Sequence, residues 1–293
     1  MYSVIINLLG LLTFKSYFLK MKKTVLLLLT LLNIFSVFGS SIDTVVVTSK
    51  SMNKDISNII IKPAGYSLKS NNYPVLYLLH GAGGDYTSWT SNVPSLQKYA
   101  NEYNILIVCP DGGSTSWYFD SPIDDQIKYE TYISKELVDV IDNKYKTIPE
   151  KAARAITGLS MGGHGAFYLA FKHPDIWGAA GSMSGGLDIR PFPNGWDLPK
   201  RLGSYSDHKA FWEENTVINL VYKIKANDLK LIFDCGINDF FYDANKRLHE
   251  KLVERNIPHD YIERPGNHTW DYWANSIKYQ LLFFSDYFDS QKN

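Results

Sequence analysis

The stretch Gly158-Leu159-Ser160-Met161-Gly162 constrains the fold of this chain more than any other. An apolar run over 154–157 precedes it, and a stretch of helical character over 163–172 follows it. A serine at the tip of a sharp turn between a strand and a helix needs small residues two positions before and after it, because strand and helix cross there almost in contact. Free N–H groups at the start of that helix would point toward an anion formed beside the serine. An ordinary glycine-rich turn can have the same sequence, so only the surrounding sequence can distinguish a catalytic serine from such a turn.

Apolar runs alternate with segments of helical periodicity along the rest of the chain. A hairpin of two strands is predicted at 45–48 and 57–62, and further strands at 75–79, 105–109, 154–157, 177–183, 230–235 and 261–263. Helices are predicted at 129–145, 163–172, 240–255 and 274–288. This alternation predicts an α/β fold, with a mostly parallel, doubly wound central sheet and helices on both faces. Glycine-rich or polar clusters follow the carboxyl ends of several strands, and that edge is where such sheets place their sites.

The segment 185–228 is long, polar and aromatic, and it is predicted to be an insertion over the active edge. It is predicted to form either a small helical cap or an ordinary surface loop. The expected domain organisation is an N-terminal extension over 1–39 and one α/β domain over 40–293, a length that suits a single large core.

Two apolar runs, 4–14 and 24–38, precede the expected domain. The second follows Met21-Lys22-Lys23 and ends in small residues, which is typical of a secretory signal peptide. We therefore expect translation to start at Met21, cleavage near Gly39 and an exported protein. The alternative is an uncleaved membrane anchor, although the apolar run is short for a membrane span.

Removing residues 1–39 takes away four lysines and no acidic residue, which leaves 26 basic and 30 acidic side chains, a net charge of about −4. This balance predicts no nucleic-acid partner and no stable association with an anionic membrane after cleavage. Cys109 and Cys235 could form a disulfide in an exported protein. They lie at the ends of strands that the predicted fold keeps apart, so two buried free thiols are favoured.

A serine nucleophile needs a base, and the base needs an acid that orients it; in this fold the chain order is serine, acid, histidine. Three histidines lie far enough downstream of Ser160. His249 falls within a predicted helix, and His259 precedes the last strand. His268 follows that strand in a loop at the active edge, so it is the predicted base.

Three carboxylates compete for the acid: Asp234 lies within a strand, Asp243 within a helix, and Asp239 in the loop between them. Asp239 is the prediction, although it could instead cap the following helix. The oxyanion formed on attack needs two backbone donors. We expect these to be the N–H groups of Met161 and of Ala82, which lies in the glycine-rich loop after the strand 75–79.

His80 precedes the nucleophile in the chain, so its expected role is to hold that loop, and His164 is expected to pack in the core. The sequence shows no cluster with metal-ligand spacing and no phosphate-binding loop of the P-loop type, so neither a metal nor a cofactor is predicted.

Together, five motifs resemble the esterase D-like family of α/β-hydrolases, which includes S-formylglutathione hydrolases, tributyrin esterases, carbohydrate esterase family 1 feruloyl and acetylxylan esterases, and mycolyltransferases. They are Leu78-Leu79-His80-Gly81-Ala82-Gly83-Gly84, Pro110-Asp111-Gly112-Gly113 with Trp117-Tyr118, Gly158-Leu159-Ser160-Met161-Gly162-Gly163, Cys235-Gly236-Ile237-Asn238-Asp239-Phe240, and Pro265-Gly266-Asn267-His268-Thr269-Trp270.

The resemblance implies an α/β-hydrolase fold, a triad of Ser160, Asp239 and His268, and oxyanion donors at Ala82 and Met161. It also implies that Trp117 and Tyr118 border the acyl pocket and that Trp270 contacts the substrate. Formylglutathione hydrolases are cytosolic and carry a cysteine in the loop that has the sequence His-Gly-Ala-Gly-Gly in this chain. The chain therefore resembles the carbohydrate-esterase and tributyrin-esterase branches of the family more than the formylglutathione hydrolases.

The sequence therefore predicts an exported serine carboxylesterase that acts on acetyl or feruloyl esters of plant polysaccharides or their oligosaccharides. Alternatives are a general short-chain carboxylesterase or thioesterase, acyl transfer to a sugar, and a non-catalytic binding protein on the same fold.

Overall fold

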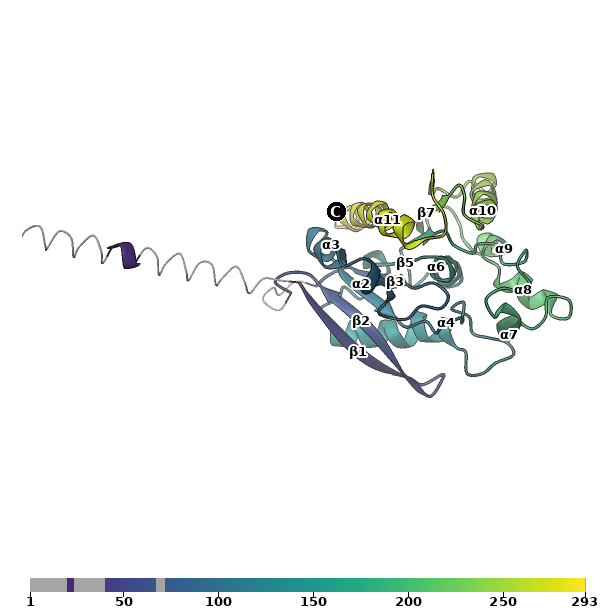
Figure 1. Ribbon diagram of the computed structural model, residues 1–293, viewed down its shortest axis with the longest axis horizontal. Helices are drawn as coiled ribbons and strands as arrows, with labels where there is room; N and C mark the ends of the chain where they lie inside the picture. The colour runs from purple at the N-terminus through teal and green to yellow at the C-terminus, as the bar shows by residue number, and fades with distance from the viewer. Residues whose placement is uncertain (1–19, 24–39, 67–71, 293) are drawn as a thin grey trace, which may run out of the picture. The chain divides into compact units, whose positions relative to one another are not determined.

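An eight-stranded sheet runs through the computed structural model, which describes residues 20–23, 40–66 and 72–292 (Figure 1). The strand order is β1-β2-β4-β3-β5-β6-β7-β8. The strands are β1 (Ser41–Ser49), β2 (Lys54–Lys62), β3 (Val75–Leu79), β4 (Leu106–Pro110), β5 (Arg154–Gly158), β6 (Ala179–Met183), β7 (Lys230–Gly236) and β8 (Asp260–Arg264). The β1–β2 and β2–β4 pairs are antiparallel, and every other pair is parallel. Strands β3 to β8 therefore bring their carboxyl ends to one edge.

Helices cover both faces of the sheet because side chains alternate between the faces along each strand. In β3, Tyr77 and Leu79 pack in one core cluster, and Leu76 and Leu78 pack in the other. The first cluster includes residues of η1 (Tyr132–Leu137), α5 (Val138–Lys144), α6 (Met161–Lys172) and α10 (Tyr242–Glu254). The second includes residues of α2 (Ser88–Asn92), α3 (Leu96–Glu102) and α11 (Trp270–Ser290). This arrangement confirms the predicted α/β-hydrolase type of sheet with helices on both faces.

The predicted strands all form, with ends that differ by a few residues. Two short helices, α2 and α3, were not predicted from the sequence. The helix predicted over 129–145 is α4 (Tyr129–Thr131), then the π-helical segment η1, then α5. The first turn of α6 begins at Met161, two residues earlier than predicted, directly after Ser160.

The predicted insertion at 185–228 folds into α7 (Leu198–Leu202), α8 (Lys209–Asn215), α9 (Val217–Leu220) and the 3-10 turn η3 (Val221–Lys223). Apolar side chains of these elements, Trp212 among them, are buried in the first cluster. The segment is thus a helical addition packed on the body of the domain, and one of its residues reaches the site described below.

The residues from Ser40 onward form one compact unit. The predicted signal peptide and its cleavage point lie almost wholly outside the described residues. In the part of the chain that the structure describes, no helix is long and apolar enough to cross a bilayer. Cys109 and Cys235 are buried free thiols in β4 and β7, as predicted, with β3, β5 and β6 between those strands.

Candidate active site

Ser160 lies at a sharp turn between β5 and α6. Its backbone has φ 55° and ψ −118°, which side-chain-bearing residues rarely adopt. A Cβ on Gly158 would lie 2.6 Å from the carbonyl carbon of Gly162, and a Cβ on Gly162 would lie 2.5 Å from the carbonyl oxygen of Leu79. Close approach of the backbone therefore requires glycine at both positions, and this is why small residues were expected there.

Ser160, His268 and Asp239 form one hydrogen-bonded chain. His268 Nε2 lies 2.8 Å from Ser160 Oγ, and His268 Nδ1 lies 2.8 Å from Asp239 Oδ2. A carboxylate can only accept hydrogen bonds, so Nδ1 of His268 has to donate to it. Nε2 of the neutral ring is then the acceptor for the serine hydroxyl. The arrangement can therefore take up the proton of the Ser160 hydroxyl when the oxygen attacks.

Asp239 is not the N-cap of α10, which is Phe241, so the capping alternative considered from the sequence is wrong. Its Oδ1 accepts the backbone N–H of Phe241 just before α10, while its Oδ2 faces His268. Asp234 is fully buried and bonds Arg264 and Gln280 instead. Asp243 lies in the first turn of α10.

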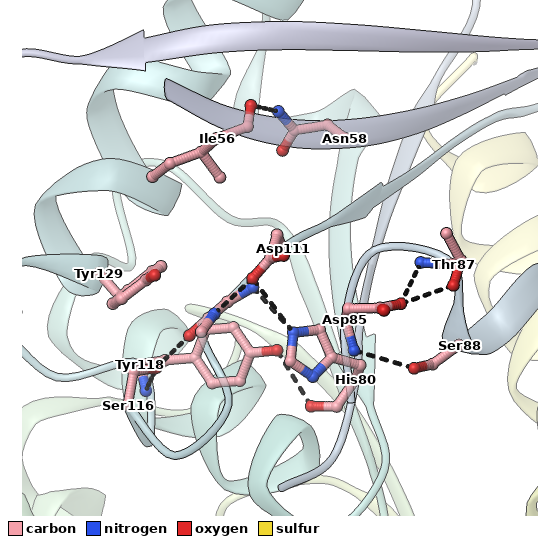
Figure 2. A network of polar contacts seen from close by, with 12 residues as sticks. Ile56, Asn58, His80, Asp85, Thr87, Ser88, Asp111, Ser116, Tyr118 and Tyr129 are labelled. Carbon is pink, nitrogen blue, oxygen red and sulfur yellow. Dashed lines mark hydrogen bonds and ion pairs between the residues drawn. The ribbon is translucent and has the colours of Figure 1, made fainter. Parts of the chain in front are cut away.

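The loop after β3 is held by His80, as expected (Figure 2). His80 Nδ1 lies 2.8 Å from the carbonyl oxygen of Gly81, and because a carbonyl oxygen can only accept, Nδ1 is the donor. Nε2 accepts a hydrogen bond from the backbone N–H of Gly112 at 2.8 Å. Burial lowers the pKa of His80, so the ring stays neutral and keeps this acceptor. Figure 2 also shows Tyr118, whose hydroxyl donates to the carbonyl oxygen of His80 at 3.0 Å.

Both expected oxyanion donors lie beside Ser160. Ala82 lines the same pocket as the serine, and Met161 follows it at the first position of α6. Among the described residues, neither N–H group donates to a backbone carbonyl. Two free donors at this place suit a developing oxyanion.

A pocket of about 430 Å³ surrounds the serine and histidine. It is lined by residues 81–84 together with Ser88, Asn92, Leu159, Ser160, Trp196, Phe240, His268, Trp270 and Trp273. Trp270 was expected here from the sequence, whereas Trp196, Phe240 and Trp273 were not. The sequence offers little to identify these residues. Phe240 directly follows the predicted acid, and Trp196 is one of the aromatic residues in the insertion.

Trp117 and Tyr118 do not line this pocket, which corrects the expectation that they border it. Both side chains are almost fully buried. The Tyr118 ring fills the space that Gly112 and Gly165 leave, where a Cβ would come within 2.2 and 2.3 Å of it. Trp117 packs edge-on against His164 and donates from Nε1 to the carbonyl oxygen of Trp196 at 3.1 Å. Trp117 and Tyr118 therefore support the site indirectly, through their hydrogen bonds to the backbone of Trp196 and of His80.

His164 packs in the core, as expected. Burial lowers its pKa to about 4, while the hydrogen bond between Nδ1 and the carbonyl oxygen of Gly186 acts in the opposite direction. His249 and His259 bond each other at 2.8 Å and take no part in the chain at Ser160. In the described segments, no group of three or more histidine, cysteine or acidic side chains is placed to hold a metal.

A serine at such a turn, bonded to a histidine and a carboxylate at the carboxyl edge of this sheet, defines a protein of the α/β-hydrolase fold. The chain belongs to the esterase family: the family model described as "Putative esterase" matches residues 49–284.

Individual proteins are similar over most of the chain. Esterase MT1326 of Mycobacterium tuberculosis is 29% identical over 72% of this chain and 52% of its own length, so the chain spans about half of that relative. An acetyl esterase of Caldicellulosiruptor saccharolyticus is 27% identical over 78% of this chain and 92% of its own length. A solved ferulic acid esterase has a TM-score of 0.75 and 27% identity, and covers 86% of this chain and 99% of its own.

Proposed function

We propose that the protein is an exported serine carboxylesterase that hydrolyses acetyl or feruloyl esters on plant polysaccharides or their oligosaccharides. The observation that carries the proposal is the hydrogen-bonded chain from Asp239 through His268 to Ser160, 2.8 Å at each step, whose serine and histidine line a pocket. The similarity to an acetyl esterase and to a ferulic acid esterase supports the choice of acyl groups. Export rests on the sequence over 21–39.

In the first half of the reaction, His268 takes the hydroxyl proton of Ser160 while Oγ bonds to the carbonyl carbon of the ester. The carbonyl oxygen becomes an anion that the N–H groups of Ala82 and Met161 stabilise. The carbon–oxygen bond to the alcohol then breaks, and His268 gives its proton to the departing oxygen. In the second half, His268 activates a water that hydrolyses the acyl-enzyme, and Ser160 regains its proton.

The test is hydrolysis of p-nitrophenyl acetate, p-nitrophenyl butyrate, methyl ferulate and acetylated xylan, with Ser160→Ala as the control. Efficient cleavage of methyl ferulate or acetylated xylan that the alanine variant has lost supports the proposal. Cleavage of the p-nitrophenyl esters alone contradicts the polysaccharide substrate and favours a general short-chain esterase. A folded protein that cleaves none of the four contradicts the assigned triad.

A further inference from the structure

The pocket wall beside His268 is aromatic and exposed. Trp196 and Phe240 lie with nearly parallel rings, 5.6 Å between centroids and 19° between planes. At this separation the rings are offset, so part of each face stays uncovered. The two residues are 37% and 50% exposed. We call this pair the Trp196–Phe240 platform.

The loop at 115–117 holds the chain at Trp196 and Asp197. Trp196 and Asp197 have φ values of 43° and 58°. Residues with side chains rarely adopt positive φ values, and surrounding contacts are needed to maintain them. Trp117 Nε1 donates to the carbonyl oxygen of Trp196, and Thr115 Oγ1 donates to Asp197 Oδ2 at 3.0 Å. The backbone that carries the Trp196 ring is therefore constrained independently of any ligand, which reduces the entropic cost of binding.

Proton transfer determines which part of an ester meets the platform. His268 Nε2 receives the Ser160 proton and returns it to the departing alcohol oxygen, so that oxygen has to lie beside Nε2. The carbonyl oxygen lies instead toward the N–H groups of Ala82 and Met161. The rings of Phe240 and Trp273 lie 4.2 Å and 4.8 Å from the His268 ring, and both line the pocket. Through Phe240, the platform is within reach of the group attached to the alcohol oxygen.

We propose that the Trp196–Phe240 platform binds the alcohol part of the ester and that this part is a sugar ring; the proposal rests on the proposed function. The C–H face of a pyranose is apolar and of a size that two offset rings can cover, whereas a small alkyl alcohol would leave most of the platform exposed. The polar residues Ser88 and Asn92 also line this pocket. An aromatic wall together with a few polar groups suits a ligand that has an apolar face and hydroxyls at its edge.

The first experiment keeps the acetyl group constant and changes the alcohol. It compares kcat/KM for methyl acetate with kcat/KM for a monoacetylated methyl β-xylopyranoside. Trp196→Ala should lower the ratio of sugar ester to methyl ester at least tenfold, mainly through KM, and Trp196→Phe should restore most of it. Phe240→Leu, which keeps an apolar cover on His268, should lower the same ratio. Tyr222→Ala is the matched control, because Tyr222 lies in the same insertion, is 65% exposed and is no part of the pocket.

An unchanged ratio in Trp196→Ala overturns the proposal. A loss that appears when the acyl group is varied instead, between methyl acetate and methyl ferulate, also overturns it, because the platform would then hold the acyl group.

A binding measurement separates this proposal from the proposed function. Calorimetric titration of the Ser160→Ala protein with xylo-oligosaccharide should give saturable binding that weakens at least tenfold when Trp196→Ala is added. If the wild type hydrolyses no ester but this binding is found, the platform is supported and the proposed function fails. If esters are hydrolysed and no sugar binding depends on Trp196, the platform proposal fails alone.

Discussion

Arg264 and Asp234 form an ion pair in the interior, with 2.8 Å between Arg264 Nη2 and Asp234 Oδ1. Asp234 lies five residues before Asp239, and Arg264 lies four residues before His268. The backbone N–H of Ile237 also donates to the carbonyl oxygen of Arg264, at 2.9 Å. The pair therefore joins the two chain segments that lead to the proposed acid and base.

Replacing Asp234 with alanine should destabilise the fold strongly. Asp234 is fully buried, and its loss leaves the half-buried Arg264 guanidinium without its carboxylate, although the contacts with the Tyr272 and Tyr279 rings remain. Breaking a buried pair by removing one member costs about 3–5 kcal/mol. Urea unfolding of Asp234→Ala measures this loss. Asp289→Ala is the control, because it breaks an exposed pair with Lys292 and should change stability little. Equal stability of the two variants would contradict a structural role for the buried pair.

Asp239→Asn should keep the fold and lower kcat by about 10³–10⁴, because an amide can hold His268 in the wrong tautomer. Steady-state kinetics on p-nitrophenyl acetate measures the loss, and Asp243→Asn is the neighbouring control. If Asp243→Asn were the damaging change and Asp239→Asn were not, the assignment of the acid would be wrong.

Gly162→Ala should reduce both activity and stability. The added Cβ would lie 2.5 Å from the carbonyl oxygen of Leu79 and 2.6 Å from that of His80, and these backbone atoms cannot move independently of β3. Thermal melting together with ester hydrolysis tests this. Gly195→Ala, where the nearest atom is 3.4 Å away, should be tolerated. Normal activity in Gly162→Ala would refute the crossing geometry described here.

Glu130 should contribute stability that depends on pH. Burial raises its pKa, but the hydrogen bond from His173 and the charge and hydrogen bond of Lys172 outweigh burial and lower the pKa to about 2. Because the folded-state pKa is below the unfolded value of about 4.3, the contribution, of the order of 3 kcal/mol, is present above pH 5 and is lost as the pH falls toward 2.

Urea unfolding of wild type and Glu130→Gln at pH 7, 4 and 3 measures this contribution. The difference in unfolding free energy between the two proteins should be largest at pH 7 and should shrink toward pH 3. Glu254→Gln, on an exposed side chain, controls for the substitution itself. A difference that stays constant across this range would exclude the predicted linkage.

The sequence alone was sufficient to predict the fold class, the free thiols and the residues that meet at Ser160. The reason is that these features depend on local order along the chain. An apolar run predicts a buried strand, a glycine-rich or polar cluster marks its end, and parallel strands bring those ends to one edge. Asp239 and His268 were identifiable because each lies in the loop that follows its strand. The short helices α2 and α3 had no comparable pattern, and helical periodicity does not distinguish the π-helical turns at 132–137 from an α-helix.

Only the tertiary structure decided which aromatic rings line the pocket. Trp117 and Tyr118 look like pocket residues in sequence, yet Gly112 and Gly165 open a space in the interior that the Tyr118 ring fills. Trp196 and Phe240, 44 residues apart in the chain, form the exposed wall instead. Exposure of a side chain depends on what packs against it from distant segments, and periodicity within a single segment does not carry that information.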